Sequence, residues 1–174
     1  MARKINIVLF GIGNAGSALI NKITERREAL LKNHLNVRFP VITNSSVAFF
    51  EKDGDGYAWE ANFIQFAIPF KIDDVVEYAI EHDLQNLIAV DATPSAALAA
   101  EYPDLVRTGF SVVSINESLQ YLPENFEKGI RFLTESRGLG YRFINSVPGD
   151  ANAAAEALYD GVLQVVEKIK EAAL

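Results

Sequence analysis

The 174-residue chain contains no cysteine, which excludes disulfides, thiolate chemistry and zinc sites built on cysteine. It also lacks any run of 18 or more apolar residues, so the sequence predicts no membrane-spanning helix. Basic residues are scarce, because 16 Lys and Arg stand against 23 Asp and Glu and leave a formal net charge of −7. Nucleic acid requires a basic face and is therefore not expected as a partner. A nucleotide cofactor is still allowed, since backbone dipoles can hold its phosphates locally.

The composition fits a soluble globular protein, with 49% hydrophobic and 22% charged residues. No linker, repeat or low-complexity tract divides the chain, so we expect one domain over residues 1–174. The basic start is followed by an apolar stretch that breaks at Gly11, which is typical of a strand rather than a signal peptide. The cytoplasm is the expected location.

Predicted strands and helices alternate along the whole chain. The strands are expected at residues 5–10, 37–43, 87–90, 110–114 and 141–145, and the helices at 15–32, 72–82, 95–108, 123–137 and 150–173. Pro40 indicates an edge or a bulge in the second strand, and residues 44–66 form an insertion. Crossover connections of this kind predict an α/β fold: a Rossmann-like, doubly wound, mostly parallel sheet with helices on both faces. In such sheets, ligands bind beyond the carboxyl ends of the strands.

The most informative motif is a Gly-x-Gly-x-x-Gly sequence that follows the first strand and opens the first helix. The first glycine allows a tight turn, the second lets a pyrophosphate approach, and the third lets the helix pack closely. Free N–H groups and the helix dipole then face the phosphates. The motif predicts dinucleotide binding, and a purely structural turn is the alternative. The candidate residues are Gly11, Ile12, Gly13, Asn14, Ala15 and Gly16.

The ends of the next two strands supply further candidates. Asn44 and Ser45 follow the second strand, where many NAD binders place an acid that bonds the adenosine ribose. The absent acid favours NADP slightly over NAD, although no Lys or Arg stands beside these residues to bind a 2′-phosphate; a plain polar loop is the alternative. The third strand leads into a turn that would face the nicotinamide half of the cofactor. A turn that only caps the following helix is the alternative. This turn contains Ala92, Thr93, Pro94 and Ser95.

Four segments, at residues 10–16, 42–45, 90–95 and 109–116, resemble the cofactor domain of homoserine dehydrogenase in order and spacing. The most specific are the Asp-x-Thr-x-Ser turn at residues 91–95 and the Gly-x-x-Val-Val-Ser-x-Asn segment that ends at Asn116. The resemblance implies an NAD(P)-binding domain of an enzyme that interconverts aspartate semialdehyde and homoserine. It also implies that Ser114 and Asn116 belong to the cofactor site.

The sequence departs from the family pattern at several positions. Glu117 stands where the family has Lys, and the family's acid followed by Val-Gly-x-Gly is replaced at residues 144–150, with Pro148 in place of one glycine. The family's catalytic domain should follow the final helix, but the sequence ends at Leu174. We therefore expect a stand-alone or fragmentary relative that does not complete catalysis alone. Its catalytic residues are unassigned, and it would need a separate catalytic domain or chain; a non-catalytic nucleotide-binding sensor or interaction module is the alternative.

The remaining candidates favour structural roles. His34 and His82 are expected near helix ends away from the cleft, and Asp150 is expected to cap the last helix. Asp53 and Asp55 lack the other ligands of a calcium loop, so no metal site is predicted. The aromatic residues nearby are expected to fasten their loop to the sheet edge or to line an interface. The apolar stripe of the last helix is typical of core, and any exposed part favours a homodimer.

Overall fold

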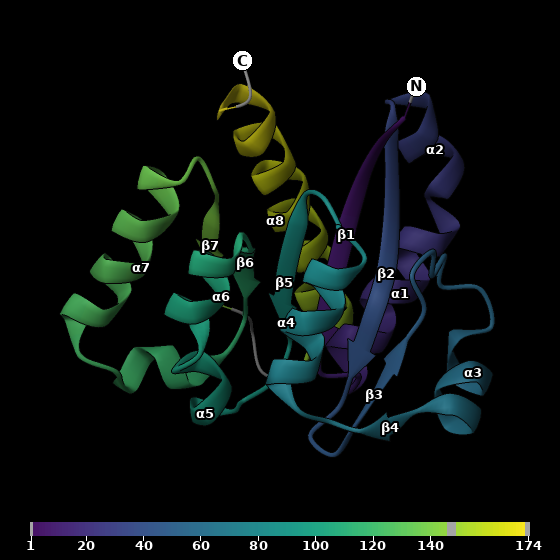
Figure 1. Ribbon diagram of the computed structural model, residues 1–174, viewed down its shortest axis with the longest axis horizontal. Helices are drawn as coiled ribbons and strands as arrows, with labels where there is room; N and C mark the ends of the chain where they lie inside the picture. The colour runs from purple at the N-terminus through teal and green to yellow at the C-terminus, as the bar shows by residue number, and fades with distance from the viewer. Residues whose placement is uncertain (1, 146–148, 173–174) are drawn as a thin grey trace.

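The computed structural model describes residues 2–145 and 149–172 and contains a seven-stranded sheet in the order β4-β3-β2-β1-β5-β6-β7 (Figure 1). Neighbouring strands from β2 to β7 in this order are parallel, whereas β3 pairs antiparallel with both β2 and β4. The doubly wound, mostly parallel sheet is therefore confirmed. The strands are β1 (Arg3–Phe10), β2 (Leu35–Thr43), β3 (Val47–Phe50), β4 (Ile68–Pro69), β5 (Leu87–Asp91), β6 (Ser111–Ser114) and β7 (Tyr141–Phe143).

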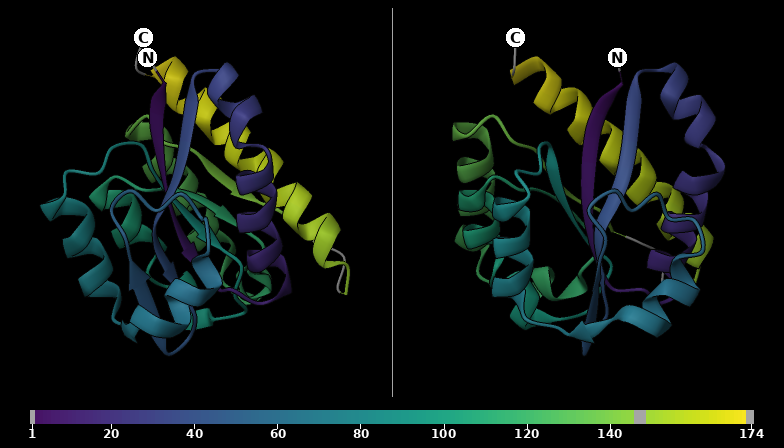
Figure 2. Two further views of the ribbon diagram at one scale, coloured as in Figure 1. Left: turned by 90° about the vertical axis from the view of Figure 1, so that its right-hand side faces the viewer. Right: turned by 45° about the vertical axis from the view of Figure 1, so that its right-hand side comes forward.

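Helices cover both faces of the sheet (Figure 2). One face carries α1 (Asn14–Glu25), α2 (Arg27–Lys32), α3 (Trp59–Phe66) and α8 (Ala151–Ala172). The other carries α4 (Ile72–Glu81), α5 (Ala96–Ala99), α6 (Tyr102–Thr108) and α7 (Glu124–Ser136), and the 3₁₀ helix η1 (Glu117–Tyr121) follows β6. Because helices cover both faces, the strands need apolar residues on both sides. In β1, Ile7 and Leu9 pack against one helix layer, and Val8 and Phe10 pack against the other.

Two predicted helices are each divided in the structure. The expected helix at residues 15–32 ends at Glu25 and restarts at Arg27, with Arg26 between α1 and α2. The expected helix at residues 95–108 is split into α5 and α6. Pro103 lies in the first turn of α6, where its missing N–H costs nothing; inside a longer helix it would remove a hydrogen bond and clash.

Pro40 marks a bulge, as one of the two sequence interpretations expects. The register between β1 and β2 passes from Asn6 opposite Arg38 to Val8 opposite Val41, so β2 holds one residue more than β1 there. The edge interpretation is wrong, because β2 lies between β1 and β3.

The insertion at residues 44–66 contains β3 and α3, which the sequence analysis did not anticipate. Trp59 and Phe63 of α3 are buried against the sheet, and Nε1 of Trp59 donates to Oδ1 of Asn21 at 3.2 Å. These aromatic residues therefore fasten the insertion to the domain.

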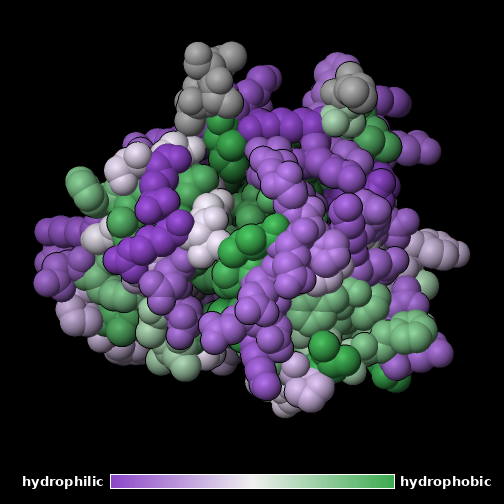
Figure 3. Space-filling model, in the orientation of Figure 1, coloured by the Kyte–Doolittle hydropathy of each residue, from purple (hydrophilic) through white to green (hydrophobic). Residues whose placement is uncertain are grey.

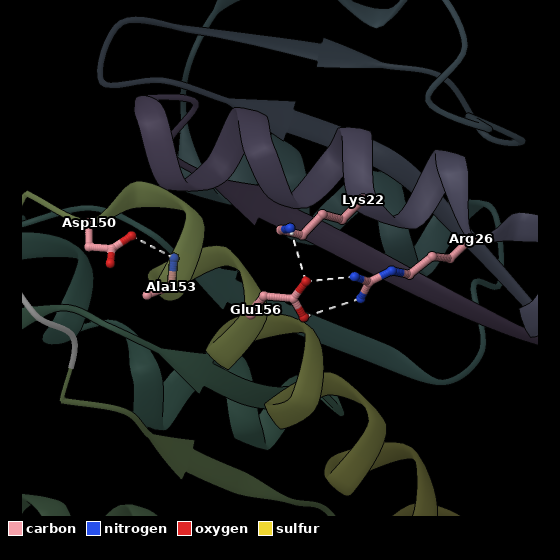
Figure 4. A network of polar contacts seen from close by, with 5 residues as sticks. All are labelled: Lys22, Arg26, Asp150, Ala153 and Glu156. Carbon is pink, nitrogen blue, oxygen red and sulfur yellow. Dashed lines mark hydrogen bonds and ion pairs between the residues drawn. The ribbon is translucent and has the colours of Figure 1, made fainter.

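An ion cluster joins the last helix to the first (Figure 4). Glu156 of α8 accepts from Nζ of Lys22 at 3.0 Å and from both terminal nitrogens of Arg26, at 2.6 and 3.3 Å. At the start of α8, Asp150 caps the helix as expected, because its Oδ1 accepts from the backbone N–H of Ala153 at 2.9 Å. The hydrogen bonds from Arg26, then the one from Lys22, lower the pKa of Glu156 from 4.5 to about 2.

This cluster makes a testable contribution to stability against acid. Because the folded-state pKa of Glu156 lies below its ordinary value, its contribution should be complete above pH 4.5 and disappear as the pH falls towards 2. We expect wild-type protein to be more stable than Glu156→Gln at pH 6, and the difference between their urea midpoints to vanish near pH 2. A difference that persists unchanged at low pH would contradict this assignment.

Candidate functional site

A cleft of about 640 Å³ opens at the carboxyl ends of the parallel strands β1, β2 and β5. It lies where the chain order reverses: β2 follows β1 on one side, and β5 lies on the other. This is the switch point at which doubly wound sheets bind ligands. The lining residues are Phe10, Gly11, Ile12, Gly13, Thr43, Asn44, Ser45, Phe70, Ile72, Ala92, Thr93, Pro94, Ser95, Ala97, Leu98 and Glu101.

The glycine turn after β1 uses its three glycines in three different ways. Gly11 has φ +98°, and a Cβ there would lie 2.9 Å from the carbonyl oxygen of Ala92. A Cβ on Gly16 would lie 1.9 Å from the carbonyl oxygen of Gly11, so this glycine lets α1 pack directly on the turn. At Gly13 φ is −67° and a Cβ would meet no atom within 4 Å. The fold therefore requires glycine at positions 11 and 16, but leaves open space at position 13.

The N-terminus of α1 faces this turn without a side-chain cap. Gly13 is the N-cap residue, no acid lies in the first turn, and Oγ of Ser17 bonds back to the carbonyl of Ile12 at 2.8 Å. The first N–H groups of a helix have no intrahelical partner. Together with the positive end of the helix dipole, they suit an anion.

A buried carboxylate holds the turn after β5. Oδ1 of Asp91 accepts from the N–H and the hydroxyl of Thr93, at 2.8 and 2.7 Å. Its Oδ2 accepts from the Tyr102 hydroxyl at 2.5 Å and from Nδ2 of Asn116 at 2.9 Å. Burial raises the pKa of Asp91, and hydrogen bonds from Tyr102, Asn116 and Thr93 act in the opposite direction. Burial, and then the charge of Asp91, raise the pKa of Tyr102, which therefore keeps its proton as a donor.

Ser114 and Asn116 lie behind the cleft, where both are fully buried. Oγ of Ser114 is hydrogen-bonded to the Tyr102 hydroxyl at 2.7 Å and accepts from the N–H of Asn116 at 3.0 Å. Nδ2 of Asn116 also donates to the carbonyl of Ser95 at 2.8 Å. These two side chains thus hold the Ser95 turn rather than line the cleft.

The β2–β3 turn contributes polar residues to the cleft. Oδ1 of Asn44 accepts from the N–H groups of Ser46 and Val47, both at 2.8 Å, which fixes the shape of this turn. Ser45 beside it is exposed. Both residues line the cleft.

Most of the predicted residues come together at this cleft, namely Gly11, Ile12, Gly13, Asn44, Ser45, Ala92, Thr93, Pro94 and Ser95. Asn14, Ala15 and Gly16 form the adjacent first turn of α1. The sequence analysis missed Phe70, Ile72, Ala97, Leu98 and Glu101, which line one end of the cleft. The first two follow an insertion whose path the pattern did not predict, and the others fall within residues 95–108, which the sequence analysis interpreted as one continuous helix.

The other sequence candidates lie elsewhere. His34 is in the turn before β2, and His82 ends α4 with its Nδ1 3.0 Å from the carbonyl oxygen of Tyr78. Glu117 is exposed at the start of η1, and Val147 and Pro148 lie outside the described residues. Among the described residues, no group of three or more His, Asp or Glu could hold a metal ion. No helix in residues 2–145 or 149–172 is long and apolar enough to cross a membrane.

The sheet order, the glycine turn and the cleft at the switch point define a Rossmann-like dinucleotide-binding type of α/β domain. Residues 11–143 match the family model described as the NAD binding domain of homoserine dehydrogenase. The chain therefore belongs to the homoserine dehydrogenase NAD-binding domain family, as its motifs predict.

Known relatives are much longer than this chain. It is 25% identical over 146 residues to a bifunctional aspartokinase/homoserine dehydrogenase of Buchnera aphidicola, which covers 83% of this chain and 18% of that protein. Homoserine dehydrogenase from Thermoplasma acidophilum has a similar fold, with a TM-score of 0.62 at 16% identity over 81% of this chain and 43% of that one. A hyperthermophilic archaeal homoserine dehydrogenase in complex with NADPH gives a TM-score of 0.62 at 21% identity over 81% and 44%. The chain thus spans less than a fifth of that curated relative and under half of those solved chains.

Two glycine substitutions should have opposite effects on stability, because Gly16 lies in the contact between α1 and the glycine turn and Gly129 does not. Gly16→Ala should destabilise the protein by about 1–3 kcal/mol, because its Cβ has no room beside Gly11. Gly129→Ala, in the middle of α7 with no atom within 4 Å, should stabilise it by up to about 1 kcal/mol through helix propensity. Urea denaturation measures both, and equal effects would contradict the close-contact assignment.

The Asp91 network predicts a cost for removing one hydroxyl. Tyr102→Phe leaves Oδ2 of Asp91 with fewer donors, and should lower the free energy of unfolding by about 1–3 kcal/mol. Tyr121→Phe is the matched control, because that side chain is 87% exposed, and its effect should stay within about 0.5 kcal/mol. A Tyr102→Phe protein as stable as the control would show that the network does not hold the turn.

Proposed function

We propose that residues 1–174 form one dinucleotide-binding domain that holds the diphosphate of NAD or NADP at the first turn of α1. The observation that carries the proposal is the empty space at Gly13, where a side chain would meet no protein atom. Glycine there has no role in packing, and its lack of a side chain leaves the uncapped N–H groups accessible. Backbone donors at a helix start are the usual ligands of a dinucleotide diphosphate.

The remaining cleft residues suit the two ends of a dinucleotide. Asn44 and Ser45 would bond the adenosine ribose, and the Thr93 turn would face the nicotinamide half. Ser114 and Asn116 would act through that turn, since both are buried and hydrogen-bonded behind it. We propose them as positioning residues of the cofactor site.

We propose a slight preference for NADP. Asn44 and Ser45 at the end of β2 offer hydrogen-bonding groups without a carboxylate, so a 2′-phosphate would meet no repulsion there. No Lys or Arg is among the lining residues in the described part of the chain, so the preference should be small.

The relatives' names support a role in the reaction between homoserine and aspartate semialdehyde. Hydride transfer requires a group that holds the substrate carbonyl and a proton donor. Among the described lining residues, Glu101 is the one ionisable side chain. We therefore propose that catalysis requires a separate catalytic domain or chain, and leave the catalytic residues unassigned. A non-catalytic nucleotide sensor or interaction module is the alternative, which the acid at position 117 favours.

We also propose that two copies associate. The apolar stripe of α8 is buried in the core at Ala155, Leu158 and Val162, so it does not supply the contact. Exposed apolar side chains instead gather over α3 and β4, at the lower right of Figure 3. They are Tyr57, Ile64, Phe66 and Ile68, from 50% to 85% exposed. Such a patch supports a homodimer, and the cytoplasmic location stays a prediction.

Substitution at Gly13 tests the proposed function directly. Gly13→Asp should retain the fold, because the site has open space and Asp is a favoured N-cap residue. Its carboxylate would occupy the free N–H groups and repel the diphosphate, so we expect the dissociation constants of NADH and NADPH to rise at least about tenfold. Titration followed by nucleotide fluorescence measures both constants, and circular dichroism checks the fold.

Gly129→Asp is the matched control, since it adds the same charge at an exposed position of α7. It should leave nucleotide affinity unchanged. Absence of saturable binding of either nucleotide to the wild-type chain would refute the proposed function. Unchanged affinity in Gly13→Asp would refute the diphosphate position.

A further inference from the structure

One end of the cleft forms an apolar slot between α4 and the α5–α6 segment. Its walls are Phe70, Ile72, Ala97 and Leu98. The Phe70 ring lies 6.2 Å from the ring of Phe10, measured between centroids. The backbone N–H of Phe70 donates to the carbonyl of Ser46 at 2.8 Å, which fixes this wall beside the β2–β3 turn. A flat aromatic ring is the ligand that such walls accommodate.

The slot lies where the base of a bound dinucleotide would fall. With the diphosphate at Gly13 and the adenosine ribose at Asn44 and Ser45, as proposed above, the base would extend towards Phe70. Those residues all line the same cleft. The inference therefore rests on the proposed function.

Glu101 is the one charged side chain among the described residues that line this cleft. It also lines the neighbouring groove of about 310 Å³ between α4 and α6, together with Glu77 and Asp104. It therefore lies where the cleft and this groove adjoin. Within the described part of the chain, its carboxylate makes no hydrogen bond or ion pair, although Asp104 nearby pairs with Arg107. An ionised carboxylate only accepts hydrogen bonds, so this wall of the slot presents an acceptor to the ligand.

We propose that Glu101 recognises adenine by accepting a hydrogen bond from its exocyclic amino group. Adenine carries a donor at this position, whereas hypoxanthine and guanine carry a carbonyl oxygen there, which has no hydrogen to donate to a carboxylate. Glu101 is thereby a specificity-determining residue for the base.

Two nucleotides that differ at this position of the base test the proposal. NADH and reduced nicotinamide hypoxanthine dinucleotide share the diphosphate, both riboses and the nicotinamide. A hydrogen bond to a charged group corresponds to roughly a tenfold or larger difference in affinity. We therefore expect wild-type protein to bind NADH about tenfold more tightly, as measured by fluorescence titration. In Glu101→Gln the preference should fall to about twofold or less, because an amide both accepts and donates.

Glu77→Gln is the matched control. It removes the same charge from an exposed residue that lines the neighbouring groove but not the cleft, and should keep the wild-type preference. Equal binding of the two nucleotides by the wild type, or an unchanged preference in Glu101→Gln, would overturn the role of Glu101 while leaving the proposed function intact. A Glu101→Gln variant that binds both nucleotides more weakly by the same factor would also overturn base recognition. Failure of wild-type protein to bind NADH would instead refute the proposed function itself.

Discussion

The site depends on one backbone contact, where the first turn of α1 packs against the turn that ends β1. A Cβ on Gly16 would lie 1.9 Å from the carbonyl of Gly11, and a Cβ on Gly11 would lie 2.9 Å from that of Ala92. Two segments far apart in the chain, the one from Gly11 to Gly16 and the turn after β5, therefore meet with their backbones in close contact. This contact aims the start of α1 at the carboxyl ends of β1 and β5. Because a helix leaves its first N–H groups unpaired, the packing of the fold and the donors for an anion have the same origin.

The Asp91 network holds the opposite wall of the cleft in a comparable way. A carboxylate that is 1% exposed has a large desolvation cost unless donors surround it. Thr93, Tyr102 and Asn116 supply those donors from three different segments. Asn116 then bonds the carbonyl of Ser95, so the β5 turn is tied to the loop after β6. Asn116, which the family resemblance assigns to the cofactor site, can thus act indirectly, by holding the turn that would contact the cofactor.

The parts of this structure that the sequence predicts are those with a local physical cause. The glycine spacing predicts the turn, and the alternation of strands with helices predicts the doubly wound sheet. Pro40 predicts an edge or a bulge, of which the structure contains the bulge. The sequence analysis overlooked the break near Pro103, although proline fits only the first turn of a helix. By contrast, Phe70 reaches the cleft only because β3 and β4 extend the sheet antiparallel, and no short-range pattern encodes that pairing. The position of Glu101 in the cleft was likewise not predictable from the sequence, because it depends on where α5 ends and α6 begins.

The charge distribution of the cleft limits how it can hold a nucleotide. A dinucleotide carries at least two negative charges, yet the lining residues in the described part of the chain include no Lys or Arg and one acid, Glu101. Attraction must then come from backbone N–H groups and the dipole of α1, whose effect is confined to its first turn. Such an arrangement binds phosphate at the first turn of α1 and leaves the other walls of the cleft neutral or negatively charged. The base end is consequently free to select a ligand by hydrogen-bond pattern, since no Lys or Arg is among the described residues that line the cleft or the neighbouring groove.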